Sequence, residues 1–589
     1  MSQPFAKRWN LAPPAPPDLL NAYVGMSPLV AQILYNRGLA DPLQAEAFLS
    51  ARDTSVGRFL SYKRGSNSNI DRAIGRLRNA IARKERIAVY GDFDADGVTS
   101  TVLLVQTLTA LGASVEAYIP HRVDEGYGLN AEALLKLARS GVKVVVTVDC
   151  GIRSVEDVVC GNAYGLDIII TDHHSLGPEI PNAHAVINPK CEDTPYTEPM
   201  LAGVGVAYRL AEALIMIASK GKDEINGLHL DHLLDLVAIG TVADLAPMNC
   251  LENRAFVKRG LELLNNSNRV GMRSLMEVAR LEPGTVNAQS IGFTIGPRIN
   301  AAGRLKSAMI AYDLLSTTDP TIAITRAHEL HDLNTQRQEL TREAQDLIRQ
   351  RLEANGEDES SLIFEEDDSF LPGIVGLVAG RLVNEYFKPA VIVELGEIES
   401  RASCRSIPEF DITQALDQCA DLLVRHGGHA QAAGFTVKNE NIPHLKRELG
   451  AIADSQLGGQ ALMPVIAIDA EIPLDVIRMS LLDELAQLEP TGHHHTLPIF
   501  ASNKVRVASA QPVGQDGKHM KLRLHRDDDQ PLECIAFNYT SWRPDAGDLV
   551  DIAYSLELNE WNGQQRIQLH LADVRPAERE ATVTVKGIH

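Results

Sequence analysis

The stretch Val89–Ser100, VYGDFDADGVTS, places Asp92, Asp94 and Asp96 within five residues. It overlaps the apolar run RIAVY, which is typical of a buried strand. In parallel sheets, functional residues gather beyond the carboxyl ends of the strands. Carboxylates crowded there without counter-charge repel one another and cannot all ionise in a semi-buried site. The stretch therefore predicts an α/β fold with a strand end that binds cations.

Strand-like runs and helix-like stretches alternate from about residue 85. The runs RIAVY, SVEAYIP, VKVVVTVD and LDIIITD are separated by segments such as TSTVLLVQTLTALG. Continuous apolar runs alternating with helices indicate a parallel sheet covered on both faces. Residues Leu230–Ile239 predict another buried helix, which ends at Gly240. GVGVAY at Gly203–Tyr208 predicts a closely packed helix start rather than a dinucleotide loop, because the third glycine is missing.

The predicted secondary structure changes twice in the second half of the chain. Residues Thr321–Asn355 form a long polar stretch without proline, which predicts a helix bridging two lobes. A second α/β region with SLIFEE, AVIVEL and the Gly-rich RHGGHAQAAGFTV follows, and short β-rich runs after about residue 460 predict a small barrel. We therefore divide the chain into an N-terminal extension (1–70), a catalytic domain (71–318), a connecting helix (319–355), a second α/β domain (356–455) and a barrel domain (456–589).

Composition narrows the class of protein. A chain of 589 residues predicts two to four domains, and 45% hydrophobic with 23% charged residues is ordinary for a soluble globular protein. We find no apolar run of about 18 residues, no secretory signal and no C-x-x-C pair among the seven cysteines, so we expect a cytoplasmic protein without membrane spans or disulfides. The net charge of −21 argues against a general nucleic-acid binder, although bound cations and a local basic patch would offset it.

Four sequence motifs contain candidate functional side chains, and we interpret each motif as the end of a strand. They are GDFDADG, VTVDCG with Asp149, IITDHHS with Asp172, His173 and His174, and GTVADLAP with Asp244. Taken alone, Asp149 fits a helix N-cap equally well, DHH fits a solvated turn, and the calcium-loop-like DFDADG lacks its glutamate. Together they predict a pair of divalent cations that activates water for attack on phosphorus. Mixed Asp and His ligands suit Mn²⁺ or Mg²⁺.

In this order the four motifs resemble those of the DHH phosphoesterase superfamily. GPRINAAGRL and GGHAQAAGF are similar to its RecJ branch, the 5′→3′ exonucleases specific for single-stranded DNA, and the resemblance runs from about residue 40 to the end. It implies a parallel-sheet DHH lobe, a smaller DHHA1 lobe, a long helix between them and a C-terminal OB-type β-barrel. The implied activity is metal-dependent, processive hydrolysis of single-stranded DNA to 5′-mononucleotides in recombination and repair, including mismatch repair.

The resemblance also implies roles for single residues. Residues with the family's metal-ligand pattern are Asp94, Asp96, Asp149, His173 and Asp244. Asp149 would bridge the two metals, and His174 would contact the scissile phosphate. Tyr90 stands where the pyrophosphatase branch has a histidine, and Asp92 is our candidate replacement for that ligand.

A second set of residues is expected to hold DNA. The substrate-binding candidates are Arg122, Tyr127, Arg298, Asn300, Arg304, Ser403, Arg405 and His429, although any single arginine could instead form a surface ion pair. We expect GPRINAAGRL to be a Gly-flanked loop that approaches phosphate closely. The barrel candidates are the basic residues Lys504, Arg506, Lys518, Lys521 and Arg523. Phe537, Tyr539 and Trp542 are candidate stacking platforms, with core packing favoured for Phe537, and the His493–His495 run predicts a solvated turn.

Two other functions remain open at this point. One is a phosphodiesterase for short oligonucleotides or cyclic dinucleotides, against which the added barrel argues. The other is a non-catalytic strand-binding scaffold, against which the complete set of carboxylates and histidines argues. The resemblance further implies a monomer that works with single-strand-binding protein and a helicase. It leaves open the preference between Mn²⁺ and Mg²⁺ and any activity on RNA.

Overall fold

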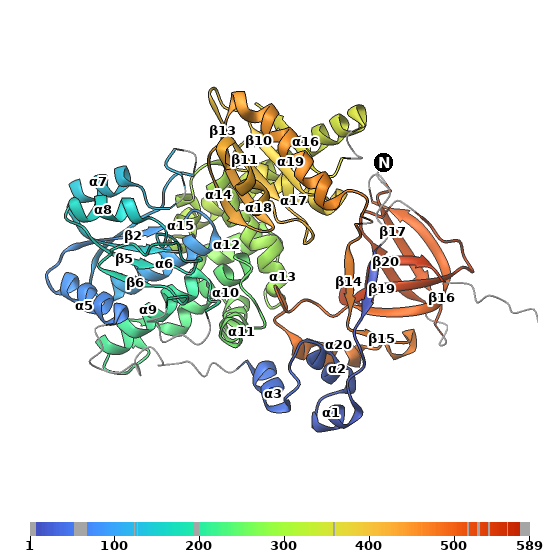
Figure 1. Ribbon diagram of the computed structural model, residues 1–589. Coiled ribbons are helices and arrows are strands. Elements are labelled where there is room, and N and C mark those ends of the chain that lie inside the picture. The colour runs from blue at the N-terminus through green and yellow to red at the C-terminus, as the bar shows by residue number, and fades with distance from the viewer. Residues whose placement is uncertain are drawn as a thin grey trace, which may run out of the picture.

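The protein consists of two α/β lobes, a long helix between them and a β-barrel (Figure 1). The computed structural model describes residues 7–51, 68–122, 124–126, 128–191, 199–356, 360–460, 462–514, 517–526, 531–539, 542–561 and 564–577. This architecture confirms the expected fold class.

The first lobe is built on a five-stranded parallel sheet with the order β3-β2-β4-β5-β6. Its strands are β2 (Arg86–Gly91), β3 (Ser114–Tyr118), β4 (Val142–Val148), β5 (Asp167–Thr171) and β6 (Ala185–Ile187). The strand order reverses beside β2, because the chain adds β3 on one side of β2 and then crosses to β4 on the other. A crevice for ligands opens at such a point, beyond the carboxyl ends of the strands.

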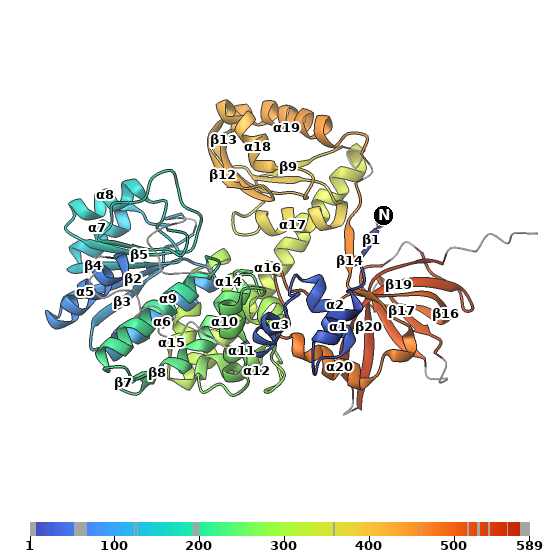
Figure 2. The same cartoon turned by 60° about the horizontal axis from the view of Figure 1, so that its bottom comes forward.

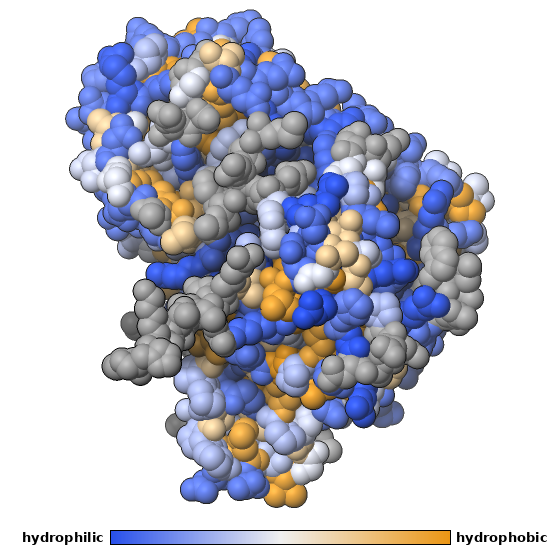
Figure 3. All heavy atoms as spheres, turned by 90° about the vertical axis from the view of Figure 1, so that its right-hand side faces the viewer, coloured by the Kyte–Doolittle hydropathy of each residue, from blue (hydrophilic) through white to orange (hydrophobic). Residues whose placement is uncertain are grey.

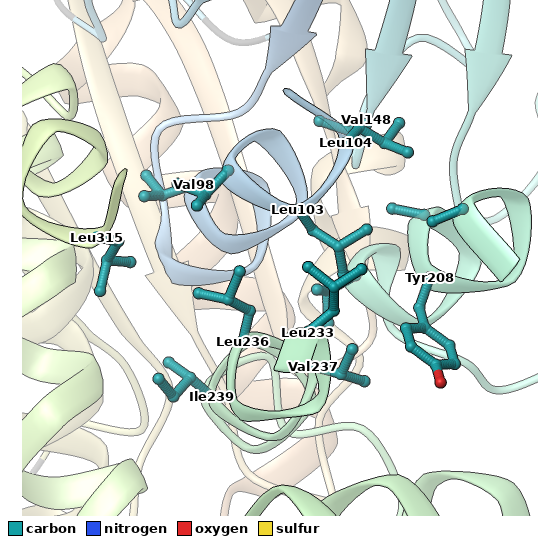
Figure 4. Close-up of a cluster of buried hydrophobic side chains, with 14 of the residues drawn as sticks. Val98, Leu103, Leu104, Val148, Tyr208, Leu233, Leu236, Val237, Ile239 and Leu315 are labelled. Atoms are coloured by element: carbon teal, nitrogen blue, oxygen red, sulfur yellow. The ribbon is translucent and has the colours of Figure 1, made fainter. Parts of the chain in front are cut away.

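Helices cover both faces of this sheet. One face carries α5 (Asn69–Ala82), α6 (Ala95–Ala110) and α9 (Gly203–Ala218), and the other carries α7 (Ala131–Arg139) and α8 (Val155–Ala163). Successive strand residues alternate between these two cores, with Val89 in one and Tyr90 in the other. Figure 4 shows the outer side of α6, where Val98 and Leu103 meet Leu236 and Val237. Because helices also pack on its outer side, α6 is a buried central element rather than a surface helix.

A helical segment completes the first lobe. Its elements are β7 (Glu224–Ile225), β8 (Leu228–His229), the 3-10 helix η1 (Leu230–Leu233), α10 (Leu234–Ala243), α11 (Leu251–Asn265), α12 (Val270–Val278), α13 (Ala288–Ser290), the π-helix η2 (Ile291–Ile295), α14 (Gly296–Leu305) and α15 (Met309–Ser316).

Two sequence predictions in this segment are wrong. Helix α10 continues past Gly240, where a Cβ atom would lie 2.5 Å from Thr99 Oγ1, so the glycine permits close packing instead of ending the helix. GPRINAAGRL is the helix α14 and not a loop. A Cβ atom on Gly303 would lie 2.3 Å from the Phe93 carbonyl oxygen, so this glycine also serves close approach.

The predicted connecting helix is α16 (Pro320–Asn355). The Asp319 side chain accepts a hydrogen bond from Thr321 N–H at its start, and Gly356 in the left-handed conformation follows its end. It packs against α12, α14 and α15 of the first lobe and against α17 (Val375–Tyr386) of the second. The helix therefore links the two lobes and packs against both of them.

The second lobe contains a mixed five-stranded sheet in the order β12-β13-β11-β10-β9. Its strands are β9 (Ile363–Asp367), β10 (Ala390–Glu394), β11 (Glu399–Arg405), β12 (Leu423–His429) and β13 (Ala432–Lys438). Helices α18 (Ile412–Gln418) and α19 (Ile442–Leu457) pack on one face, and α16 and α17 cover β9 and β10 on the other. Figure 2 shows β12 and β13 on the side of this lobe that faces the first lobe.

The barrel closes through pairing of β16 with β19. Its region comprises β14 (Val465–Ile468), β15 (Ala470–Glu471), α20 (Met479–Leu485), β16 (Phe500–Val513), β17 (His519–Leu524), β18 (Leu532–Ala536), β19 (Leu549–Trp561) and β20 (Gln564–Pro576). The N-terminal elements are β1 (Arg8–Leu11), α1 (Pro17–Ala22), α2 (Pro28–Asn36) and α3 (Pro42–Ser50). β1 pairs in parallel with β14, and Leu34 and Phe48 share a core with Phe500 of the barrel. The described N-terminal residues are thus physically part of the barrel region.

A buried arginine joins this region to the first lobe. Arg254 on α11 donates to the carbonyl oxygens of Phe48, Leu488, Glu489 and Pro490 at 2.7–2.9 Å. Its guanidinium lies 4.0 Å from the centroid of the Phe48 ring. His495 packs edge-on against the same ring and is only 1% exposed. The prediction of a solvated turn is therefore wrong for His495, although His493 and His494 are exposed.

From the barrel side, hydrophobic residues form separate patches in a largely hydrophilic surface (Figure 3). Among the described helices, none combines the length and apolar composition that crossing a bilayer requires.

Candidate metal and phosphate site

The carboxylates singled out from the sequence converge at the crevice beside β2. Asp92 and Asp94 follow β2, Asp96 lies in the first turn of α6, and Asp149 follows β4. Asp244 is the C-cap of α10, so the prediction that it ends a strand is wrong. The ends of two strands, the first turn of α6 and the C-terminal end of α10 supply these carboxylates.

His173 lies at the centre of the cluster. Its Nε2 atom is 3.0 Å from Asp149 Oδ1, 3.7 Å from Asp244 Oδ2 and 3.8 Å from Asp96 Oδ2. Asp92, Asp94 and Asp149 form a second group whose ligand atoms lie within 4.8 Å of one another. Asp149 contacts both groups, which gives the cluster room for two ions with one shared carboxylate.

The electrostatics fit divalent cations. Asp92 Oδ1, Asp149 Oδ1 and His173 Nε2 are buried and lack a hydrogen-bond partner in the described chain. Burial and the neighbouring carboxylates raise the pKa of Asp149 well above its usual range and that of Asp96 to about 7. Burial, followed by the charge of His174, lowers the pKa of His173 to about 3, so its imidazole is neutral. Oxygen ligands with a neutral imidazole suit Mn²⁺ or Mg²⁺, and an added positive charge would return the carboxylates to their ionised form.

Backbone groups fix the carboxylates in place. Asp96 accepts hydrogen bonds from Gly203 N–H at 2.7 Å and Val204 N–H at 2.8 Å, at the N-terminus of α9. Asp94 accepts from the N–H groups of Asp96 and Gly97, so Asp94 is the N-cap of α6. The N-cap alternative considered for Asp149 fails, because Asp149 caps no described helix and has a φ of +61°.

Asp172 orients both histidines, a role that sequence reasoning missed. Its Oδ1 atom accepts from His174 Nδ1 at 2.8 Å and from the N–H groups of His173 and His174, and its Oδ2 atom accepts from Ile152 N–H. Burial alone would lower the pKa of His174, but the hydrogen bond and charge of Asp172 outweigh burial and raise it. The sequence signal that could have indicated this role is the position of Asp172 directly before His173 and His174.

Tyr90 does not reach the cluster. Its hydroxyl donates to the Gly128 carbonyl at 3.0 Å and accepts from Asn130 Nδ2 at 3.2 Å, and its ring stacks on Tyr118. The carboxylate of Asp92 lies in the cluster instead.

Four of the expected phosphate-binding residues gather beside the acidic cluster, where the two lobes meet. Arg304 Nη1 donates to the Gly373 carbonyl of the second lobe at 3.1 Å. Arg405 donates to Ser403 Oγ at 3.3 Å, and the Arg122 guanidinium lies 4.6 Å from the Phe93 ring centroid. Burial and the charge of Arg122 lower the pKa of Arg304 to about 10, while Asp94 acts in the opposite direction. Positive charge thus lies directly against the carboxylates.

Other candidates are differently placed. Asn300 Oδ1 accepts from Ala95 N–H at 2.7 Å and so holds the start of α6. His429 is exposed on β12 and shares a row with Ala432 and Arg405 across the sheet. Arg298 contacts His331 of α16. Tyr127 lies outside the described residues.

The basic face of the barrel is partly neutralised. Glu533 pairs with Lys521 at 2.9 Å and Arg523 at 3.0 Å. Arg506 donates to the Gly547 carbonyl, Lys504 N–H donates to Asp551, and Lys518 lies beside the start of β17.

The barrel's three candidate stacking residues are placed differently from the sequence prediction. Phe537 is 57% exposed, and its ring lies between His519 and His570 at centroid distances of 5.3 and 5.5 Å. Tyr539 and Trp542 pack against the barrel core. The prediction of core packing for Phe537 is therefore wrong: Phe537 is exposed, whereas Tyr539 and Trp542 are half-buried.

Comparison with known proteins gives a consistent assignment. Family models match residues 86–241 (DHH family, N-terminal domain), 359–455 (DHHA1 domain) and 468–573 (RecJ OB domain). The chain is 34% identical over 577 residues to the single-stranded-DNA-specific exonuclease RecJ of Bacillus subtilis, spanning 97% of this chain and 71% of that protein. The chain belongs to the RecJ family. The motif-based recognition of the RecJ branch is confirmed.

Solved RecJ structures share the fold. RecJ from Thermus thermophilus in complex with Mn²⁺ matches with a TM-score of 0.81 at 29% identity, covering 97% of this chain and 80% of that one. The same RecJ in complex with Mg²⁺ matches with a TM-score of 0.75 at 28% identity, covering 97% and 79%.

Proposed function

We propose that this RecJ family member is a metal-dependent, processive exonuclease that degrades single-stranded DNA from the 5′ end to 5′-mononucleotides. The observation that carries the proposal is the junction of the two lobes, where an acidic cluster with orphaned ligand atoms abuts a group of arginines. The names of the RecJ relatives support the substrate and the reaction class.

The proposed metal ligands are the six residues of the cluster. They are Asp92, Asp94, Asp96, Asp149, His173 and Asp244. Bound Mn²⁺ or Mg²⁺ would supply an activated water and stabilise negative charge on the phosphoryl oxygens. The Mn²⁺ and Mg²⁺ complexes of the Thermus relative support the choice of ion.

The remaining residues hold the strand. His174, whose Nδ1 is held by Asp172, would offer its other ring nitrogen to the scissile phosphate. Arg122, Ser403 and Arg405 would bind the terminal 5′-phosphate, since guanidinium forks match phosphate oxygens. A pocket for a terminal phosphate at this place would set the direction of digestion.

Further expectations belong to the same proposal. Phe537 and the basic residues of the barrel would hold the departing strand, which favours long DNA over dinucleotides or cyclic dinucleotides. The complete ligand set favours an enzyme over a non-catalytic scaffold. All seven cysteines are free, which fits a reducing cytoplasm. We also propose that the protein acts in repair and recombination as a monomer, beside single-strand-binding protein and a helicase, and family membership is the support for this.

The test uses one oligonucleotide labelled at either end. Wild-type protein with Mn²⁺ should release labelled mononucleotide at once from the 5′-labelled strand, while the 3′-labelled strand shortens progressively. EDTA and Asp149→Ala should abolish release, whereas Asp368→Ala, an exposed aspartate in the second lobe, should not. Strand binding without cleavage would support a scaffold, and cleavage restricted to dinucleotides would support a small-substrate phosphodiesterase.

A further inference from the structure

Asp244, one of the proposed metal ligands, ends its helix in a strained turn. It is the C-cap of α10, and the next residue, Leu245, donates its N–H to the Val242 carbonyl at 3.2 Å. Ala246 N–H donates to the Thr241 carbonyl at 3.1 Å. This pattern is a Schellman motif, in which the residue after the cap is left-handed and is usually glycine. Here that residue is Leu245, with a φ of +58°, a conformation that costs a leucine energy and persists only where its surroundings enforce it.

Contacts with the barrel region hold this turn. Met248 N–H donates to the His493 carbonyl at 2.8 Å. Partial burial lowers the pKa of His493, whereas a hydrogen bond from its ring to the Leu245 backbone acts in the opposite direction. A Cβ atom on Gly492 would lie 2.7 Å from Met248 Cγ, so the two segments are in close contact. The TGHHHTLP segment thus lies directly on the loop that follows α10.

The same barrel segment is fixed to the first lobe. Gly492 and His495 exchange backbone hydrogen bonds at 2.8 and 3.1 Å, which closes the turn. Arg254 on α11 binds the preceding carbonyl oxygens, as described above. The neighbouring Asn253, which is fully buried, donates to the Pro247 carbonyl at 3.2 Å. One residue of α11 therefore binds the barrel segment, and the residue beside it binds the loop after α10.

We propose that His493 and the turn Gly492–His495 position the metal ligand Asp244, so that one of the two ions is bound tightly only when the barrel region is docked on the first lobe. His493 is a positioning residue, because it acts through the backbone of residues 245–248. The inference rests on the proposed function, since it takes Asp244 as a metal ligand. Partners that orient a ligand typically change metal affinity 10- to 100-fold.

The effect should be confined to one ion. Asp244 groups with Asp96 and His173, and the other group consists of Asp92, Asp94 and Asp149. A displaced Asp244 therefore weakens the first ion position and leaves the second complete.

The test is titration of metal-free protein with Mn²⁺ by calorimetry. His493→Ala should bind one of two ions about ten-fold more weakly and the other with unchanged affinity. His444→Ala, which removes an exposed histidine from α19, should bind both ions as wild-type protein does. Asp244→Asn should weaken the same ion as His493→Ala. Adding His493→Ala to Asp244→Asn should cost no further affinity, because both changes act through one ligand.

Further variants separate positioning from a general structural role. Leu245→Gly should restore Mn²⁺ affinity to His493→Ala, because glycine adopts the left-handed conformation without a steric penalty. Gly492→Ala, whose Cβ atom would collide with Met248, should weaken the same ion. Gly450→Ala, which has open space around its Cβ atom, should not. Thermal unfolding of each metal-free variant is measured in parallel.

Three results would overturn the inference. They are unchanged Mn²⁺ affinity in both His493→Ala and Gly492→Ala, equal loss of both ions, and a lowered unfolding temperature of His493→Ala that Leu245→Gly does not rescue. Unchanged Mn²⁺ binding in Asp244→Asn would instead refute the proposed ligand role on which the inference rests. Cleavage of DNA is measured separately, and two bound ions without cleavage would count against the proposed exonuclease activity while leaving the positioning role intact.

Discussion

Gly203→Ala should reduce the activity of the protein without unfolding it. Gly203 begins α9, and a Cβ atom there would lie 2.8 Å from both Cβ and Oδ1 of Asp149. Approaches under 3.0 Å essentially never occur for real Cβ atoms, so either Asp149 or the helix must move. Both alternatives disturb the metal cluster, since Gly203 N–H also binds Asp96 at 2.7 Å.

The size of the effect follows from these distances. Bringing a 2.8 Å approach out to an ordinary contact of 3.4 Å requires a displacement of about 0.6 Å. If Asp149 moves, its 3.0 Å contact with His173 changes by a similar amount. A misplacement of about 1 Å typically reduces a rate about 100-fold, so we expect kcat/KM to fall about 10- to 100-fold.

Gly205→Ala is the matched control. A Cβ atom at Gly205 meets Leu201 side-chain atoms at 3.4 and 3.5 Å, which are ordinary contacts. Alanine stabilises a helix interior by about 1 kcal/mol over glycine, so this variant should be active and at least as stable as wild-type protein. The assays are release of 5′-labelled mononucleotide, Mn²⁺ titration by calorimetry and thermal unfolding. Wild-type kcat and Mn²⁺ affinity in Gly203→Ala would refute the reasoning.

Three further predictions follow from the site and the barrel. Asp172→Asn should lower the pKa of His174 in metal-free protein, because Asp172 raises that pKa in wild-type protein, and it should reduce activity about 10- to 100-fold. Titration of the His174 ring by NMR measures the pKa, and an unchanged value would contradict the prediction. In the folded protein without metal, the pKa of the Asp96 carboxyl group is about 7, against 3.8 in the unfolded chain, so the folded state binds this proton more tightly. The free energy of unfolding measured in EDTA should therefore fall as the pH rises from about 4 to 7. Saturating Mn²⁺ should remove this trend in thermal unfolding. Phe537→Ala should weaken single-strand binding by about 1–3 kcal/mol in a fluorescence titration and leave the unfolding temperature unchanged. Tyr539→Ala should instead lower the unfolding temperature, because the Tyr539 ring packs on the barrel core and its hydroxyl donates to the Val574 carbonyl.

The sequence was most informative where local pattern and chemistry coincide. The run before Asp92 is buried on both faces of the sheet, so it is apolar throughout and ends abruptly at the carboxylates. Asp149 and His173 follow strands of the same sheet, and parallel strands bring such ends together. The structure brings Asp244 to the cluster, but from the end of a helix and not from the end of a strand. The predicted helix Leu230–Ile239 ends at Gly240, so the residues before Asp244 are expected in a separate strand, whereas α10 continues through them to Ala243.

Other features depend on contacts between distant segments. The glycines at 240 and 303 look like chain breakers in the sequence, yet each serves close packing inside or beside a helix. Arg337 lies in a helix rich in charged residues, and nothing nearby distinguishes it from exposed Arg342. The packing of α16 against α14 and α17 buries the Nε atom of Arg337 and leaves Arg342 exposed to solvent. Similarly, Phe537 follows an apolar strand, and only barrel closure turns its ring outward.

The pairing of β1 with β14 has a consequence for how the chain is made. Leu11 and Ile468 are register partners separated by 457 positions. At about 5–20 residues per second, a ribosome needs roughly 20–90 s to produce the partner of the first strand. During that interval both lobes can fold while Val30, Leu34 and Phe48, which become core residues, stay without their partners. These N-terminal helices thus emerge long before the barrel that completes their core, and a ribosome that stalls before the barrel leaves a product in which their apolar side chains are exposed.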